Sequence, residues 1–188
     1  MSIRPIETRY RGYRFRSRLE ARWAVFFDAA KIRWLYEPQG FCVNGRAYLP
    51  DFHLPDLKCY FEVKPTSEYD LDLLQSFANE IGEDMVVAEG GIPDPAEWLC
   101  EPTIQLRLLH AIRPGEADPD GFADDMAWGY RDMLLECSSC GCIRVMNEVY
   151  SSMKDNCGKC SDSHARWMPL SHALEAARGA RFEHGERG

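Results

Sequence analysis

Two carboxylates and a lysine occur at a spacing that could bind a metal ion. Asp51 ends one short apolar run, and Glu62 and Lys64 are two positions apart in the next one, residues 58–64. Residues two apart in a β-strand share a face, so we expect Glu62 and Lys64 to point the same way and the apolar residues between them to point the other way. Mg²⁺ binds oxygen ligands from one or two carboxylates and completes its shell with water and substrate phosphate. The pattern therefore predicts a divalent metal site on one face of a sheet.

Such a site could hydrolyse a phosphodiester. Asp51 and Glu62 would bind the metal, helped by the backbone carbonyl of Val63. Lys64 would orient or deprotonate the attacking water, while the metal lowers the pKa of that water and stabilises charge in the transition state. The alternative is that Asp51 caps a turn and that Glu62 and Lys64 form an ordinary pair on an exposed strand.

The elements that must position these residues follow from the hydrophobic pattern. An apolar stripe at helical spacing predicts a helix that starts after Ser17, and Asn44-Gly45 is typical of a tight hairpin turn. The predicted helices cover residues 17–31 and 68–81, and the predicted strands cover residues 34–36, 40–43, 46–54, 58–64, 85–88 and 104–111. These elements contain the core order α-β-β-β-α-β.

The motif itself resembles that of a known superfamily. Pro50-Asp51 followed by Glu62-Val63-Lys64 resembles the PD-(D/E)xK signature of the restriction-endonuclease-like nucleases. The arginine-rich segment 10–24 resembles the first helix of small nuclease-like proteins of phages and prophages. The resemblance covers about the first half of the chain. It implies an αβββαβ core and an endonuclease that cuts DNA with Mg²⁺ or Mn²⁺.

Glu20 has two possible roles. The resemblance implies that a glutamate on the first helix completes the metal site. However, Ser17-Arg18-Leu19-Glu20 also matches S-x-x-E, the capping box, in which the glutamate hydrogen-bonds back to the start of the helix. Both roles stay open from the sequence.

Four cysteines form a second candidate metal site. Cys137, Cys140, Cys157 and Cys160 have the spacing C-x₂-C-x₁₆-C-x₂-C, in which two tight knuckles aim four thiolates at one point. Four sulfurs leave no open coordination position, so we expect a structural zinc in a zinc ribbon. Cys142 has no assigned role.

Composition changes suggest how the chain is divided. We expect a nuclease-like domain over residues 1–113, a linker rich in Pro, Gly and Asp over 114–130, a zinc-ribbon module over 131–170 and a tail over 171–188. The chain has eight cysteines, no recognisable signal peptide and no apolar run of membrane-spanning length. These features predict a cytoplasmic protein with no membrane partner.

Charge is unevenly distributed along the chain. The formal net charge is −8, yet residues 1–36 carry an excess of arginine and lysine. A basic arm on an acidic body is compatible with a surface for DNA phosphates, although a solvated basic face would give the same pattern. We expect a Mg-dependent deoxyribonuclease. The alternative is a catalytically inactive adaptor that binds nucleic acid or protein through the zinc ribbon, and a homodimer or a partner protein bound through the ribbon also stays open.

Overall fold

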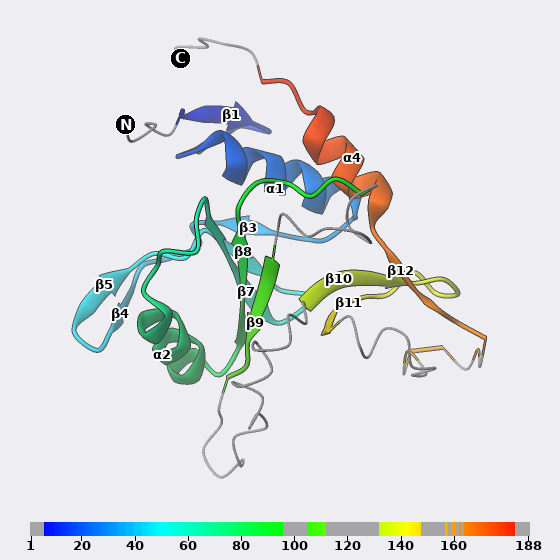
Figure 1. Ribbon diagram of the computed structural model, residues 1–188. Helices are drawn as coiled ribbons and strands as arrows, with labels where there is room; N and C mark the ends of the chain where they lie inside the picture. The colour runs from blue at the N-terminus through cyan, green and yellow to red at the C-terminus, as the bar shows by residue number, and fades with distance from the viewer. Residues whose placement is uncertain are drawn as a thin grey trace.

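The computed structural model describes residues 6–95, 105–111, 132–147, 157, 159, 160, 162 and 164–182. It has the predicted mixed α/β character, with helices on both faces of a central eight-stranded sheet (Figure 1). The helices are α1 (Arg18–Ala29), α2 (Leu71–Ile81) and α4 (Ser171–Gly179). None of the helices in these ranges is long and apolar enough to cross a membrane.

The central sheet has the strand order β11-β10-β9-β8-β7-β6-β3, and β12 also pairs with β10. The pair β7 and β8 is parallel, and the other pairs are antiparallel. Its strands are β3 (Leu35–Tyr36), β6 (Phe52–Leu54), β7 (Cys59–Lys64), β8 (Asp84–Glu89), β9 (Gln105–Leu109), β10 (Asp132–Cys137), β11 (Ile143–Asn147) and β12 (Trp167–Pro169). Two hairpins lie outside it: β1 (Thr8–Tyr10) with β2 (Tyr13–Phe15), and β4 (Phe41–Val43) with β5 (Arg46–Tyr48).

Strand β7 is buried on both faces, because helices cover both sides of the sheet. Phe61 and Val63 point toward α1, where the Phe61 ring lies 4.8 Å from Trp23 and 5.0 Å from Phe27 between centroids. Tyr60 points the other way, toward Phe77 of α2. The alternation predicted for this strand is present, and it places Glu62 and Lys64 on the face that carries α2.

Local signals explain where most elements begin and end. Ser17 caps α1 by accepting a hydrogen bond from the Glu20 N–H. Helix α2 begins three residues later than predicted, because Asp70 is its N-cap and accepts from the Leu73 N–H at 3.0 Å. Its C-cap is Gly82, whose φ of +73° lies in the left-handed region in which many helices end.

The predicted strand 46–54 is two strands, β5 and β6, in two different sheets. Pro50 lies in the break between them. It has no backbone N–H to donate, so the β6–β7 ladder, which ends at the Phe52–Phe61 pair, could not continue through Pro50. The end of this ladder leaves room for side chains beside the last residues of β7.

The C-terminal segment packs against the first half of the chain. Strand β10 joins β9 in the central sheet, and α4 lies alongside α1 (Figure 1). Leu170 and Leu174 are buried in the same core as Phe61. The predicted tail therefore contains an ordered helix, whereas the predicted linker 114–130 falls outside the described residues.

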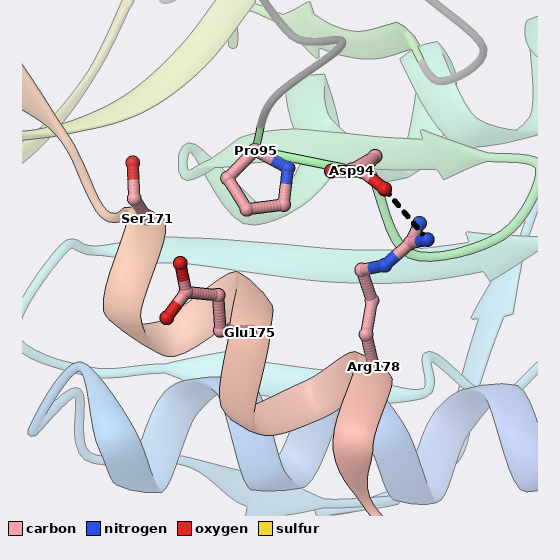
Figure 2. A pocket seen from close by; sticks show the side chains of 5 residues that line it. All are labelled: Asp94, Pro95, Ser171, Glu175 and Arg178. Carbon is pink, nitrogen blue, oxygen red and sulfur yellow. Dashed lines mark ion pairs between the residues drawn. The ribbon is translucent and has the colours of Figure 1, made fainter.

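An ion pair holds α4 to the segment after β8. Arg178 bonds the Asp94 carboxylate at 2.8 Å and the Ile92 carbonyl at 3.3 Å, at the side of a pocket of about 490 Å³ (Figure 2). Asp94 and Glu175 both line this pocket, and its one arginine is already paired with Asp94. The pocket therefore does not suit an anionic ligand, and none of the predicted site residues line it.

We predict that α4 is required for the stability of the whole fold. Leu174→Ala should lower the free energy of unfolding by about 2–5 kcal/mol, because it leaves a cavity in the shared core. The exposed neighbour Glu175→Ala should change it by less than about 0.5 kcal/mol. Urea unfolding followed by tryptophan fluorescence would measure both, and equal effects of the two substitutions would contradict a shared core.

Candidate functional site

Asp51 lies where the β6–β7 ladder ends, and its side chain there accepts a hydrogen bond from the backbone of β7. Its Oδ2 accepts from the Val63 N–H at 2.8 Å, and its side chain is almost fully buried. Its Oδ1 contacts Arg16 Nη2 at 2.5 Å. The contact between Val63 and the carboxylates is thus made through the backbone N–H, and the ligand role expected of the Val63 carbonyl stays a prediction.

Glu62 lies directly beside Asp51 and is also buried, with 4% of its surface exposed. Its Oε1 contacts Lys64 Nζ at 2.7 Å, and its Oε2 accepts from the Tyr48 hydroxyl at 2.8 Å and from the Asp51 N–H at 3.2 Å. Lys64 is 29% exposed. The strand thus places a buried carboxylate and a partly exposed ammonium side by side, as the two-residue spacing predicts.

Glu20 faces the same region from α1. Its hydrogen bonds are with the start of the helix and with Tyr36, and its role as a metal ligand stays a prediction. Its Oε1 accepts from the Ser17 hydroxyl at 2.8 Å, which belongs to the cap of the helix. Its Oε2 accepts from the Tyr36 hydroxyl at 2.6 Å and from the Arg16 N–H at 3.1 Å. It is 7% exposed, which is more burial than a capping residue at a helix start requires.

The other two carboxylates act electrostatically on Asp51. Burial, followed by the negative charge of Glu62 and then that of Glu20, raises the pKa of Asp51 to about 8, although the Val63 N–H and Arg16 oppose this rise. Three of the five polar or charged residues that are buried in the described ranges belong to this cluster. Such a concentration of buried negative charge calls for cations beside it.

The carboxylates are of the donor type that hard divalent cations prefer, whereas among the described residues only the four cysteines discussed below bring three or more ligand atoms within 4.8 Å of one another. The cluster presents carboxylate oxygens from Glu20, Asp51 and Glu62, which are the ligand type that Mg²⁺ and Mn²⁺ prefer. Two side-chain cations, Arg16 and Lys64, carry one charge each against the three carboxylates. When Asp51 is ionised, the three carboxylates exceed these two cations by one negative charge.

Several residues of the cluster were not singled out from the sequence. Tyr36 and Tyr48 each donate a hydroxyl to a carboxylate, and burial together with those carboxylates raises the pKa of both. Glu37 bonds Arg16 Nε at 2.8 Å. Arg16 is one of several arginines in its segment, and no spacing rule distinguishes it from the others. The tyrosines end strands before the motif, a position that could have identified them.

The polar face continues across the sheet. Glu89 is paired in register with Lys64 on the neighbouring strand β8 and is buried. It accepts a hydrogen bond from the Tyr69 hydroxyl and lies 3.6 Å from Arg107 Nε. By contrast, Gln75 of α2 donates to Asn79 and to the His110 carbonyl, which places it outside the cluster.

The four predicted cysteines lie together. The ligand atoms of Cys137, Cys140, Cys157 and Cys160 are all within 4.8 Å of one another. The Sγ–Sγ distances are 3.8 Å for Cys137–Cys160, 3.5 Å for Cys140–Cys157 and 3.0 Å for Cys157–Cys160. Four sulfurs at about 2.3 Å from a tetrahedral zinc are about 3.8 Å apart, so the cluster is compatible with a structural zinc.

Backbone donors support this cluster. The Cys157 Sγ accepts from the Lys159 N–H at 3.4 Å and from the Cys160 N–H at 3.2 Å. The Cys160 thiol and these N–H groups lower the pKa of Cys157 to about 6, which favours the thiolate that zinc needs. Cys142 packs beside the cluster but is not one of its four members.

Comparison with protein-family models, with curated proteins and with solved structures gave no match for this chain. The two clusters are therefore the features from which a function can be inferred.

We predict that the charge of Asp51 destabilises the metal-free fold as pH rises. Its pKa is about 8 in the folded protein against 3.8 ordinarily, so between about pH 4 and 8 the unfolded chain releases this proton first and the folded state loses stability. Asp51→Asn cannot titrate, so its stability relative to the parent should increase from pH 5 to pH 8. Added Mg²⁺ at pH 8 should stabilise the parent and not the variant.

Urea unfolding of zinc-loaded protein at several pH values would measure this difference. A stability difference between parent and Asp51→Asn that stays constant with pH, together with no effect of Mg²⁺ on the parent, would contradict a strained carboxylate cluster.

The cysteine cluster should hold one zinc per chain. We expect metal analysis of protein purified without chelator to give one equivalent, and Cys157→Ser to lose it. Cys142→Ser should retain the zinc, since this residue is outside the set of four. Zinc retained by Cys157→Ser and lost by Cys142→Ser would show that the ligand set is wrong.

Proposed function

We propose that this protein is a metal-dependent endonuclease that hydrolyses phosphodiester bonds in DNA. The observation that carries the proposal is the meeting of Asp51, Glu62 and Lys64 at the end of the β6–β7 ladder, with Glu20 reaching the same place from α1. Buried acidic oxygens beside a lysine are the donor set that metal-assisted hydrolysis of a phosphate ester needs. The motif resemblance points to the same chemistry.

Each residue has a defined part in the proposed reaction. Asp51, Glu62 and Glu20 would hold Mg²⁺ or Mn²⁺, which supplies Lewis-acid activation of water and phosphate when bound. Lys64 orients the water as the ammonium or takes its proton as the neutral amine, and its side chain is 29% exposed. The Tyr48 hydroxyl fixes the position of Glu62 by donating to its Oε2.

DNA as the substrate is supported by the charge distribution. The arginine-rich segment runs through β2 into α1, and Arg16 within it contacts Asp51 at the site. Arginine supplies planar, paired donors that suit phosphate oxygens. The net charge of the rest of the chain is negative, which restricts the phosphate contacts to this region.

The alternative is a catalytically inactive adaptor that binds nucleic acid or a protein through its zinc ribbon. The four-cysteine cluster favours it, since a structural metal often supports a small binding module. An adaptor has no need of a divalent ion at Asp51 and Glu62. Metal binding at the carboxylates therefore separates the two functions.

We predict that zinc-loaded protein cuts DNA only when Mg²⁺ or Mn²⁺ is added. Glu62→Gln and Lys64→Ala should each reduce the cleavage rate by about 100-fold or more. Glu62→Gln removes the charge of a metal ligand, and Lys64→Ala removes the group that orients or deprotonates the attacking water. Glu20→Gln should also fail to cut, although Gln can still take part in a capping box. A panel of labelled linear, nicked and branched DNAs would provide the assay.

The matched control is Glu80→Gln. Glu80 is an exposed residue of α2 that lies outside the cluster, so this variant should cut at the parental rate. If Glu62→Gln and Lys64→Ala also cut at that rate, the active-site assignment is wrong. Parental cleavage by Glu20→Gln alone at limiting Mg²⁺ would make Glu20 a helix cap and leave the other two assignments standing.

A further inference from the structure

Arg16 occupies the accessible oxygen of Asp51. The Asp51 Oδ2 is held inside the sheet by the Val63 N–H, so a cation arriving from solvent would bind Oδ1. Arg16 Nη2 lies 2.5 Å from Asp51 Oδ1, and Arg16 Nε forms an ion pair with Glu37 Oε1 at 2.8 Å. The Arg16 side chain is 54% exposed, whereas that of Asp51 is 4% exposed. The guanidinium thus covers a buried carboxylate from the outside.

The backbone of Arg16 is fixed while its side chain extends into solvent. Its N–H donates to Glu20 Oε2 and to the Tyr36 hydroxyl, both at 3.1 Å. These contacts hold the residue beside the carboxylate cluster whatever its side chain does. An exposed arginine side chain changes rotamer in nanoseconds or less, so the guanidinium can leave Asp51 without any change in the fold.

A guanidinium and a divalent ion cannot share Asp51 Oδ1. Both would need the same oxygen, and the two positive charges would repel one another at contact distance. Mg²⁺ carries twice the charge on a smaller centre, and it also gains ligands from Glu62, which Arg16 does not contact in the described interactions. The divalent ion, when present, should therefore bind Asp51 more strongly than Arg16 does.

We propose that Arg16 alternates between two positions: it is the counter-ion of Asp51 in the metal-free protein, and a divalent metal displaces it toward the phosphodiester of the substrate. The inference deepens the proposed nuclease function and rests on it for the identity of the substrate. The displaced guanidinium stays beside the metal because its backbone is fixed. Its planar pair of donors then suits a phosphate oxygen pair.

The first test measures metal binding without DNA. In Arg16→Gln the competitor and its charge are both removed, so the Kd of Mn²⁺ should fall by roughly threefold to tenfold, a range set by the modest strength of a half-exposed ion pair. Arg16→Lys keeps the positive charge but loses the planar pair of donors, and it should give an intermediate Kd for Mn²⁺. Titration of zinc-loaded protein with Mn²⁺, followed by electron paramagnetic resonance, would give these values.

The matched control is Arg14→Gln, which removes an arginine two residues away whose partner is the exposed Glu7. Its Kd for Mn²⁺ should equal that of the parent. If Arg16 merely positions Asp51, Arg16→Gln would bind Mn²⁺ more weakly or unchanged, and this result would overturn the proposal. Thermal unfolding of each variant confirms that the compared proteins are folded.

The second test measures DNA binding in a Lys64→Ala background, in which cleavage should be slower by about 100-fold or more. With saturating Mn²⁺, Arg16→Gln should bind a labelled duplex more weakly, and the slope of log K against log salt should fall by about one, the value for a single phosphate contact. Without Mn²⁺ the two proteins should bind alike, since Arg16 is then held by Asp51. Equal binding under both conditions would refute the phosphate contact.

The two proposals can fail separately. A parent that cuts no DNA, but whose Mn²⁺ affinity rises in Arg16→Gln, would remove the nuclease function and retain the exchange at Asp51. A parent that cuts DNA, but whose Mn²⁺ affinity falls in Arg16→Gln, would retain the nuclease and remove the exchange.

Discussion

The burial of three carboxylates in one region of the fold is the constraint on which the rest of the structure depends. Each buried carboxylate must be balanced by donors or cations, since an unpaired one would cost several kcal/mol. The chain meets this need with Arg16 and Lys64, with the hydroxyls of Tyr36 and Tyr48, and with backbone N–H groups. Apolar residues at these positions would make the fold more stable. Stability therefore does not explain the cluster, and we interpret it as a functional site.

The sheet creates the opening in which this cluster lies. Strand β6 runs beside β7 only from Phe52 to Leu54, and Pro50 prevents its extension. The last residues of β7 therefore lack a strand neighbour on that side, and Asp51 fills the vacant bonding position at Val63. The same proline that begins the sequence motif thus has a physical role in forming the site. The aromatic core under β7 keeps this strand in place, because Phe61 packs against Trp23 and Phe27.

Much of this arrangement could be predicted from the sequence, and the reasons for success and failure are physical. Period-two alternation placed Glu62 and Lys64 on one face, and the Ser17 cap located the start of α1, because both signals are local. Arg16 could not be selected, since its partner Asp51 is 35 residues away and neighbouring arginines have the same local pattern. The packing of α4 on α1 was also missed, because Leu174 finds its core only through the tertiary fold. The four-cysteine cluster was predictable because ligand spacing is itself a local rule.

The central claim is that Asp51 and Glu62 bind one divalent ion in place of Arg16. A crystal structure of the zinc-loaded protein soaked in Mn²⁺ tests it most directly, with anomalous scattering used to locate manganese. The account predicts a peak about 2.1–2.3 Å from oxygens of both carboxylates, with the Arg16 guanidinium moved off Asp51 Oδ1. No manganese at the carboxylates at saturating concentration, with Arg16 still bound to Asp51, would contradict it.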